Sequence, residues 1–212
     1  MTIELDQWHY FTSPVYTVQK PEFLEDALTV CNTELKNAHD QRETNEIYPV
    51  TMTGQLLENP KLEQLITFIG DTGWHILATQ GYAMDNFVLN FTEFWCQEHN
   101  KYSSMEYHTH PNCHLVGFYF LECPEDCPRV IVHDPRPGRV MCALPEADMS
   151  NATTASVAIN FTPKPGMLMF ANSWLPHSFN RNPSDKPFKF IHFNLVAVPG
   201  QTVFQFPEAE VI

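Results

Sequence analysis

Three histidines in this chain have the spacing of a metal site. His108 and His110 are two residues apart in Tyr-His-Thr-His, and His177 follows much later in Ser-Trp-Leu-Pro-His. Residues two apart on a strand point to the same face, so the first two imidazoles can reach one ion while a neighbouring strand adds the third. Three neutral nitrogens on one side of a metal leave positions open for other ligands, as in catalytic rather than structural sites.

The sequence of the second half of the chain predicts β structure, which would position these histidines. Short β-type runs, separated by clusters of Pro, Asn, Asp and Gly, occupy residues 87–92, 115–121, 130–132, 156–161, 167–170 and 188–198. Many short strands with regularly placed turns are typical of an antiparallel sandwich or barrel. His108 and His110 run into Pro111-Asn112, and His177 follows a strand and its loop, so we expect all three at strand ends, where a substrate can reach a metal.

The first part of the chain predicts helices. An apolar stripe at helical spacing runs from Leu24 to Leu35, followed by a polar stretch over 36–46 that we interpret as a loop. Asn59 and Pro60 have the types preferred at the cap and first position of a second helix, which we expect to reach Gly81.

The composition fits one globular domain. With 43% apolar and 17% charged residues, the chain can bury a core. We expect an α+β, mainly β fold as a single domain over 1–212, with a helical N-terminal layer over 1–84 packed on a jelly-roll core over 85–200. The net charge of −13 opposes attraction to nucleic acid or an anionic membrane, and no apolar run approaches the ~20 residues that cross a bilayer.

We expect the cysteines to be reduced thiols rather than to form a framework of disulfide bonds. Six are present in a chain whose acidic start lacks the basic region of a secretory signal. Cys123 and Cys127 could form half of a zinc clip, but no second pair follows at a familiar spacing. The intervening Pro-Glu-Asp favours a hairpin loop.

Blocks around the histidines resemble a known family. They occur in the order His-Thr-His-Pro-Asn (108–112), Leu-Val-Gly-Phe-Tyr-Phe (115–120), His-Asp-Pro-Arg (133–136), Pro-Gly-Met-Leu-Met-Phe (165–170) and Ser-Trp-Leu-Pro-His (173–177). In this order they resemble 2-oxoglutarate/Fe(II)-dependent oxygenases, in particular a small branch found in marine bacteria and cyanobacterial phages. The resemblance covers about residues 90–197. It implies a double-stranded β-helix (jelly roll), non-haem Fe(II), 2-oxoglutarate and O₂.

The resemblance assigns the metal ligands residue by residue. His108 matches the first His of the family's His-X-Asp/Glu motif, and His177 matches the distal His. His110 stands in the place of the acid, and an imidazole there raises the net charge of the site by one. Asp134 is an alternative acidic ligand if its strand comes close. No catalytic residue beyond the metal ligands is implied.

The cosubstrate site departs further from the family. An Arg on the last strand usually pairs with the distal carboxylate of 2-oxoglutarate, but its position corresponds to Phe188 here. Lys189 is one residue further and points to the opposite face unless the strand is bulged. Lys189 is the cofactor-binding residue we predict, with Lys186 and Arg181 as further candidates.

Three functions stay open at this point. The first is hydroxylation of a small-molecule or peptide substrate by Fe(II) and 2-oxoglutarate. The second is a three-histidine dioxygenase that does not use 2-oxoglutarate, which the missing Arg favours. The third is an inactive jelly-roll binding or structural protein, such as a phage particle component. We expect a cytoplasmic chain, or a virion protein if phage-encoded, without membrane or nucleic-acid partners and with self-association or phage structural partners left open.

Overall fold

A computed structural model describes residues 5–41, 49–138 and 144–200, in which antiparallel strands predominate. Two α-helices and two short 3-10 helices lie between β1 and β3 in chain order. In chain order the elements are β1 (Val15–Gln19), η1 (Pro21–Phe23), α1 (Leu24–Asp40), β2 (Val50–Met52), η2 (Pro60–Leu62), α2 (Glu63–Thr79), β3 (Phe87–His99), β4 (Met105–His108), β5 (Leu115–Glu122), β6 (Val130–His133), β7 (Ala158–Phe161), β8 (Met167–Asn172), β9 (His177–Phe179) and β10 (Phe188–Pro199).

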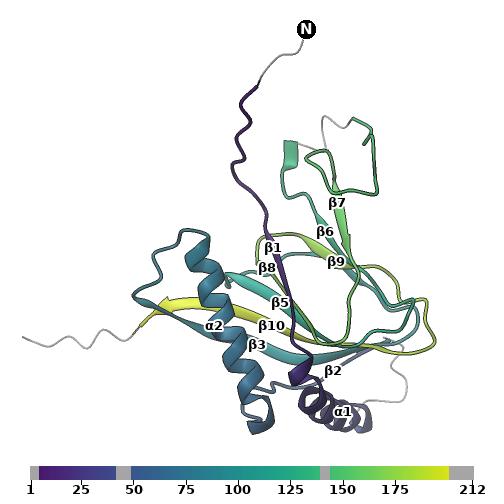
Figure 1. Cartoon of the computed structure of the whole chain (residues 1–212). Coiled ribbons are helices and arrows are strands. Elements are labelled where there is room, and N and C mark those ends of the chain that lie inside the picture. Colours follow the sequence, from purple (N-terminus) through teal and green to yellow (C-terminus); the bar gives the residue numbers. More distant parts are fainter. Residues whose placement is uncertain (1–4, 42–48, 139–143, 201–212) are drawn as a thin grey trace, which may run out of the picture.

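The strands form two facing sheets. The larger sheet has the order β1-β8-β5-β10-β3-β2 and the smaller one β4-β9-β6-β7. Neighbouring strands are antiparallel throughout, and many neighbours are far apart in sequence, as in β8 between β1 and β5. Figure 1 shows the smaller sheet lying across the larger one, with the β6–β7 hairpin projecting beyond it. The expected α+β, mainly β architecture is confirmed.

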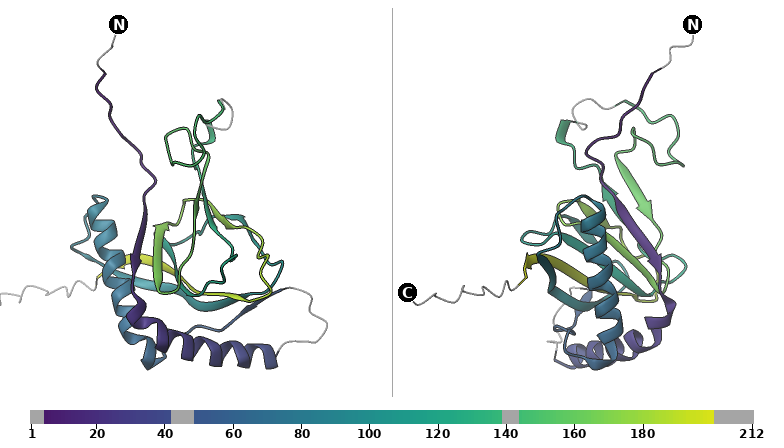
Figure 2. Two further views of the ribbon diagram at one scale, coloured as in Figure 1. Left: turned by 45° about the vertical axis from the view of Figure 1, so that its right-hand side comes forward. Right: turned by 60° about the vertical axis from the view of Figure 1, so that its left-hand side comes forward.

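Helices α1 and α2 cover the outer face of the larger sheet (Figure 2). Their apolar stripes, including Val30, Leu35, Leu65 and Ile69, pack with the outward side chains of the strands in one buried cluster. Burial of this face, more than helix propensity, holds such helices in place. The predicted cap is present, since Asn59 accepts a hydrogen bond from the Lys61 N–H at 3.1 Å.

The prediction of a loop from residue 36 is wrong over 36–40, because α1 continues to Asp40. Lys36 pairs with Asp40 at 2.8 Å on the exposed face, and His39 Nε2 lies 2.8 Å from Glu98 Oε1 on β3. These contacts extend the helix beyond its apolar stripe, and the remainder of the predicted loop lies outside the described residues.

A second apolar cluster fills the space between the sheets. Its side chains are largely aromatic and come from both sheets, with Phe118, Phe120, Phe188 and Phe190 from the larger and Phe179 from the smaller. The core of the jelly roll therefore lies directly beside β9, the strand that begins with His177.

Two strands come from the part of the chain predicted to be helical. β1 and β2 lie at the two edges of the larger sheet, so residues before 85 contribute to the sheet as well as to the helical layer. The Cys123–Cys127 segment forms a turn, because the Cys127 N–H donates to the Pro124 carbonyl at 2.9 Å. The prediction of a hairpin is wrong, since the flanking strands β5 and β6 belong to different sheets and the turn carries the chain from one sheet to the other. Within the described ranges, the helices are too short or too polar to cross a membrane.

Candidate metal centre

The fold brings the three predicted histidines together. β4 pairs with β9 so that His108 lies directly opposite His177, and His110 follows two residues beyond the end of β4. The ring centroids are 4.5–5.1 Å apart, and the rings of His110 and His177 are parallel within 1°. One nitrogen from each ring lies within 4.8 Å of the others. Three imidazoles at these distances can share one cation.

Backbone carbonyls fix the orientation of two of these rings. His108 Nδ1 lies 2.7 Å from the Glu106 oxygen, and His177 Nδ1 lies 3.0 Å from the Leu175 oxygen. A carbonyl only accepts, so each Nδ1 carries the hydrogen and each Nε2 keeps its lone pair. Metal-binding histidines almost always have such a second bond, which sets the tautomer.

The free nitrogens of the site fit a metal. Nε2 of His110 and Nε2 of His177 are buried and have no hydrogen-bond partner. A buried polar atom left without a partner costs roughly 1–3 kcal/mol, and a metal ion would remove that cost. The donor set of three imidazoles suits Fe(II), Zn²⁺ and related ions.

Burial holds two of the three histidines, His110 and His177, in the neutral form. Burial, with the neighbouring His192, His177 and His108 adding to it, lowers the pKa of His110 to about 3. Burial also lowers the pKa of His177 to about 4, although the hydrogen bond to Leu175 acts in the opposite direction. Protons therefore compete little with a metal for these two residues near neutral pH.

A second group of polar side chains, not predicted from the sequence, lies behind His110. Glu93 Oε2 on β3 accepts from His192 Nε2 at 2.9 Å and from Asn194 Nδ2 at 2.6 Å. Asn194 Nδ2 also lies 3.1 Å from His110 Nδ1, and the His192 ring stacks on His110 at 5.0 Å. Glu93, His110 and His192 could also hold an ion between them.

One feature of the sequence could have pointed to part of this group. His192 and Asn194 alternate on one strand and so face the same side of the sheet, as His108 and His110 were expected to do. Glu93 is directly opposite Asn194 in the pairing of β3 with β10. That pairing joins residues about a hundred positions apart, which no local pattern reveals.

Asp134 is not one of the residues whose ligand atoms converge with those of the three histidines. Its carboxylate accepts from Arg136 Nε at 2.9 Å and Nη2 at 2.7 Å, and its Oδ1 also accepts from the Arg136 N–H at 3.0 Å. This pair braces the turn after β6. His133 and His114 are likewise held by hydrogen bonds, to Ser178 and to the Ala197 N–H.

The structure does not bring Lys189 to the histidines either. Its ammonium lies 2.8 Å from Asn32 Oδ1 on α1, 3.2 Å from Glu122 Oε1 and 3.5 Å from Glu98 Oε2, on the helix-covered face. The register with β5 does shift between Lys189 and Phe190, but the side chain stays on the outer face. Arg181 and Lys186 are exposed. Phe188, at the position of the family Arg, is completely buried between the sheets.

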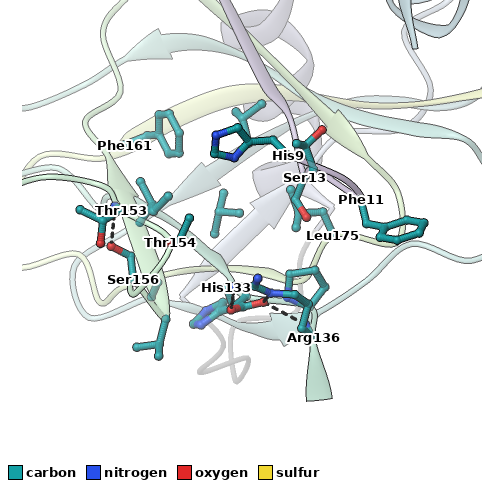
Figure 3. A pocket seen from close by; sticks show the side chains of 18 of the residues that line it. His9, Phe11, Ser13, His133, Arg136, Thr153, Thr154, Ser156, Phe161 and Leu175 are labelled. Atoms are coloured by element: carbon teal, nitrogen blue, oxygen red, sulfur yellow. Dashed lines mark hydrogen bonds and ion pairs between the residues drawn. The ribbon is translucent and has the colours of Figure 1, made fainter. Parts of the chain in front are cut away.

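One small space adjoins the site, and a larger pocket lies beyond it. A cavity of about 10 Å³ touches His177 and is otherwise lined by apolar side chains such as Phe118 and Met169. A pocket of about 390 Å³ shares Val132 and Leu175 with it and opens between the N-terminal segment and the β6–β7 hairpin. Figure 3 shows the side chains around this pocket, which include His9, Phe11, Ser13, His133, Arg136, Thr153, Thr154, Ser156, Phe161 and Leu175.

Part of the chain matches the model of a known protein family. Residues 93–194, which include all three histidines, match the family model described as "Putative 2OG-Fe(II) oxygenase". The resemblance to 2-oxoglutarate/Fe(II)-dependent oxygenases is therefore confirmed, whereas the marine and phage branch stays a prediction. No curated protein matches the chain.

Solved structures share the fold. AviO1 from Streptomyces viridochromogenes Tue57 superposes with a TM-score of 0.59 at 12% identity, over 89% of this chain and 93% of its own. HygX from Streptomyces hygroscopicus, with nickel and 2-oxoglutarate bound, gives 0.55 at 10%, over 87% and 83%. A Trichoplax adhaerens prolyl hydroxylase, in complex with a hypoxia inducible factor peptide fragment, gives 0.55 at 9%, over 86% and 83%. These likenesses show the fold, which is the expected double-stranded β-helix.

Proposed function

We propose, on the premise that residues 93–194 form a domain of the 2OG-Fe(II) oxygenase family, that this chain is an oxygenase dependent on non-haem Fe(II) and 2-oxoglutarate. The observation that carries the proposal is the convergence of one nitrogen each from His108, His110 and His177. The nickel and 2-oxoglutarate bound in HygX support the choice of metal type and cosubstrate. The reaction we assign is hydroxylation of a small-molecule or peptide substrate.

Bound Fe(II) would supply the oxygen chemistry, with 2-oxoglutarate as the cosubstrate that is oxidised. The role of the protein would be to present three neutral imidazole nitrogens to one side of the metal ion. The Glu106 and Leu175 carbonyls keep the protons of His108 and His177 on Nδ1, away from the metal side. Burial of His177 in the aromatic core excludes water from the inner side of the site.

We place the substrate in the 390 Å³ pocket, whose size is in the range of ligand pockets. Only Val132 and Leu175 are shared between this pocket and the small cavity at His177. Hydroxyl groups, aromatic rings and the charge-paired Arg136 line the pocket. Such a mixed lining suits a substrate with both polar and apolar groups.

The test is an anaerobic titration of the purified chain with Fe(II) and then 2-oxoglutarate. We expect one equivalent of metal and a weak visible charge-transfer band that appears only with both ligands. Addition of O₂ should then form succinate. A metal-loaded protein that gives neither band nor succinate would contradict the use of 2-oxoglutarate. Less than about a tenth of an equivalent of metal after loading would favour a non-catalytic protein.

The variant His177→Ala gives a second prediction from the proposed metal site. We expect metal binding to be lost, because only two ligands remain, while the free energy of unfolding changes little. The side chain is buried with one nitrogen unpaired, so its removal also removes an unfavourable term. Equilibrium dialysis and urea unfolding of the metal-free protein measure the two effects, and His75→Ala, on the exposed side of α2, is the control.

A further inference from the structure

The turn between β5 and β6 carries two free cysteines, Cys123 and Cys127, that no step of the proposed function uses. β5 belongs to the larger sheet and β6 to the smaller one, so this turn links the two sheets. The hydrogen bond from the Cys127 N–H to the Pro124 carbonyl folds the chain back on itself between the two cysteines. Both side chains pack in or against the aromatic cluster between the sheets.

The two thiols lie against each other across this turn. The Cys123 thiol donates a hydrogen bond to the Cys127 sulfur. A disulfide joins sulfur atoms about 2.05 Å apart, so thiols that already form a hydrogen bond need little movement to close it. A metal would need further ligands, and in the described part of the chain neither cysteine belongs to a group of three possible metal ligands. The geometry therefore favours thiol–disulfide chemistry over a zinc site.

The surroundings of the pair give the two sulfur atoms different roles. The hydrogen bond from Cys123 lowers the pKa of Cys127, and the positive charge of Arg129 acts in the same direction, although burial opposes both. The same hydrogen bond, together with burial, raises the pKa of Cys123. The thiolate is the nucleophile in thiol chemistry. Cys127 is therefore the sulfur that attacks, and Cys123 keeps its proton until the second step.

The other cysteines of the described residues lack this combination of properties. Cys31 and Cys96 also adjoin each other, but both are completely buried, and burial raises the pKa of Cys96 well above its usual value. Cys113 is partly exposed, but its thiol donates to a backbone carbonyl at 3.6 Å and burial raises its pKa. Cys127 retains 9% exposure and Cys123 is more open. A small oxidant can therefore reach this pair.

We propose that Cys123 and Cys127 are a redox-active pair, which hydrogen peroxide converts to a reversible disulfide across the turn between the two sheets. The Cys127 thiolate attacks one peroxide oxygen, the O–O bond breaks, and the hydroxide that leaves takes up a proton to form water. Cys127 is then a sulfenic acid. The Cys123 sulfur attacks it, and the hydroxyl group leaves with the Cys123 proton as a second water. The two thiols lose two electrons, which reduce the peroxide.

The test exposes the whole chain, reduced and free of metal so that iron does not react with peroxide, to one equivalent of hydrogen peroxide. Free thiols are alkylated at intervals, and the protein is digested with a protease that cleaves after Glu. Cleavage after Glu125 separates the two cysteines, so two peptides that stay joined until reduction identify the disulfide by mass. We expect this linkage at least about tenfold faster than oxidation of Cys113, since each unit of lower pKa gives about tenfold more thiolate.

Two serine variants separate the roles of the sulfur atoms. In Cys123→Ser the second step cannot occur, and we expect the sulfenic acid on Cys127 to persist and to be trapped by dimedone. In Cys127→Ser the attacking thiolate is absent, and we expect Cys123 to react about as slowly as Cys113. Cys113→Ser is the matched control and should form the disulfide at the wild-type rate. Circular dichroism checks that each variant is folded.

The same reaction in urea shows whether the fold prepares the pair. We expect the disulfide to form more slowly in the unfolded chain, where all six thiols are exposed to the oxidant. A native rate no higher than the rate in urea would overturn the inference, as would oxidation of Cys113 before the pair. Dithiothreitol should restore both thiols, and a product that it does not reduce would also contradict a reversible disulfide. The assay contains neither Fe(II) nor 2-oxoglutarate, so its outcome is independent of the proposed function.

Discussion

At the scale of single residues, the proposed metal site has an imidazole, that of His110, where the family has a carboxylate. A different carboxylate, that of Glu93, lies behind this imidazole. Three neutral histidines leave the full charge of a divalent metal uncancelled, whereas the family's acid would cancel one unit. Glu93 is linked to His110 through Asn194. Glu93 therefore provides a negative charge behind His110, where it accepts from His192 and Asn194 and is not one of the three proposed ligands.

Asn194 is the residue on which this arrangement depends. Its N–H faces His110 Nδ1, which suits a ring with the proton on Nε2. A ring that binds metal through Nε2 carries its proton on Nδ1 and needs an acceptor there. Asn194 Oδ1, which has no partner, provides that acceptor once the amide turns over. The partly exposed Glu93 has room to move towards solvent.

Substitutions at Asn194 should therefore change metal affinity in opposite ways. Asn194→Leu removes the acceptor, and we expect Fe(II) to bind about 10–100-fold more weakly. Asn194→Asp offers a carboxylate to the same proton, and we expect affinity at least equal to that of the wild type. Anaerobic competition with a chelator measures both, with thermal unfolding as the check on folding. Equal affinities for the two variants would rule out this role.

The sequence predicted that the three histidines converge, because the spacing of His108 and His110 is local and the strand pattern supplied the long connection to His177. The sequence could not predict that Glu93, His192 and Asn194 lie together, because their proximity depends on the register between β3 and β10.

At the scale of elements, the strand β10 is central because it pairs on both sides and carries residues of the site on its inner face. α2 presses on its outer face. A Cβ added at Gly73 would lie 2.6 Å from Leu195 Cδ1 and 3.0 Å from Leu89 Cδ1, whereas one added at Gly70 would meet nothing within 4 Å. Both glycines lie inside a helix, where glycine is unfavourable, but Gly73 is a point of close approach.

This contrast gives a matched pair of substitutions. Gly70→Ala should raise the free energy of unfolding by about 1 kcal/mol, from helix propensity alone. Gly73→Ala has the same gain but forces Leu195 and Leu89 to shift in a packed core, which costs about 1–3 kcal/mol. We expect no net gain or a loss at Gly73. Urea unfolding measures both, and equal stabilisation by the two changes would show that α2 has room to move outward.

At the scale of the whole molecule, the helical layer, the larger sheet and the aromatic interior were foreseeable from periodicity and turn residues. The positions of β1 and β2 at the edges of the larger sheet were not, because both are short segments paired with strands far along the chain. Cytoplasmic or virion location, self-association and phage partners stay predictions from composition and resemblance.

The buried histidines also make the stability of the whole metal-free protein depend on pH. His99 and His177 have pKa values of about 4 in the folded state, against about 6.5 in an unfolded chain. Between these values the unfolded chain binds protons that the folded protein does not, so the folded state loses stability as pH falls. Each histidine contributes a slope of up to about 1.4 kcal/mol per pH unit in this window and nothing above it.

Urea unfolding of the metal-free protein between pH 7.5 and 4.5 tests this dependence. Carboxylates add to the acid loss of stability, so the informative quantity is the difference between the wild type and His99→Leu, in which the same carboxylates titrate. We expect the wild type to lose stability more steeply than His99→Leu below about pH 6.5, while His75→Gln, altered at an exposed histidine, follows the wild type. Parallel curves for wild type and His99→Leu would mean that His99 takes up its proton in the folded protein, and that the aromatic interior already admits water beside Nδ1.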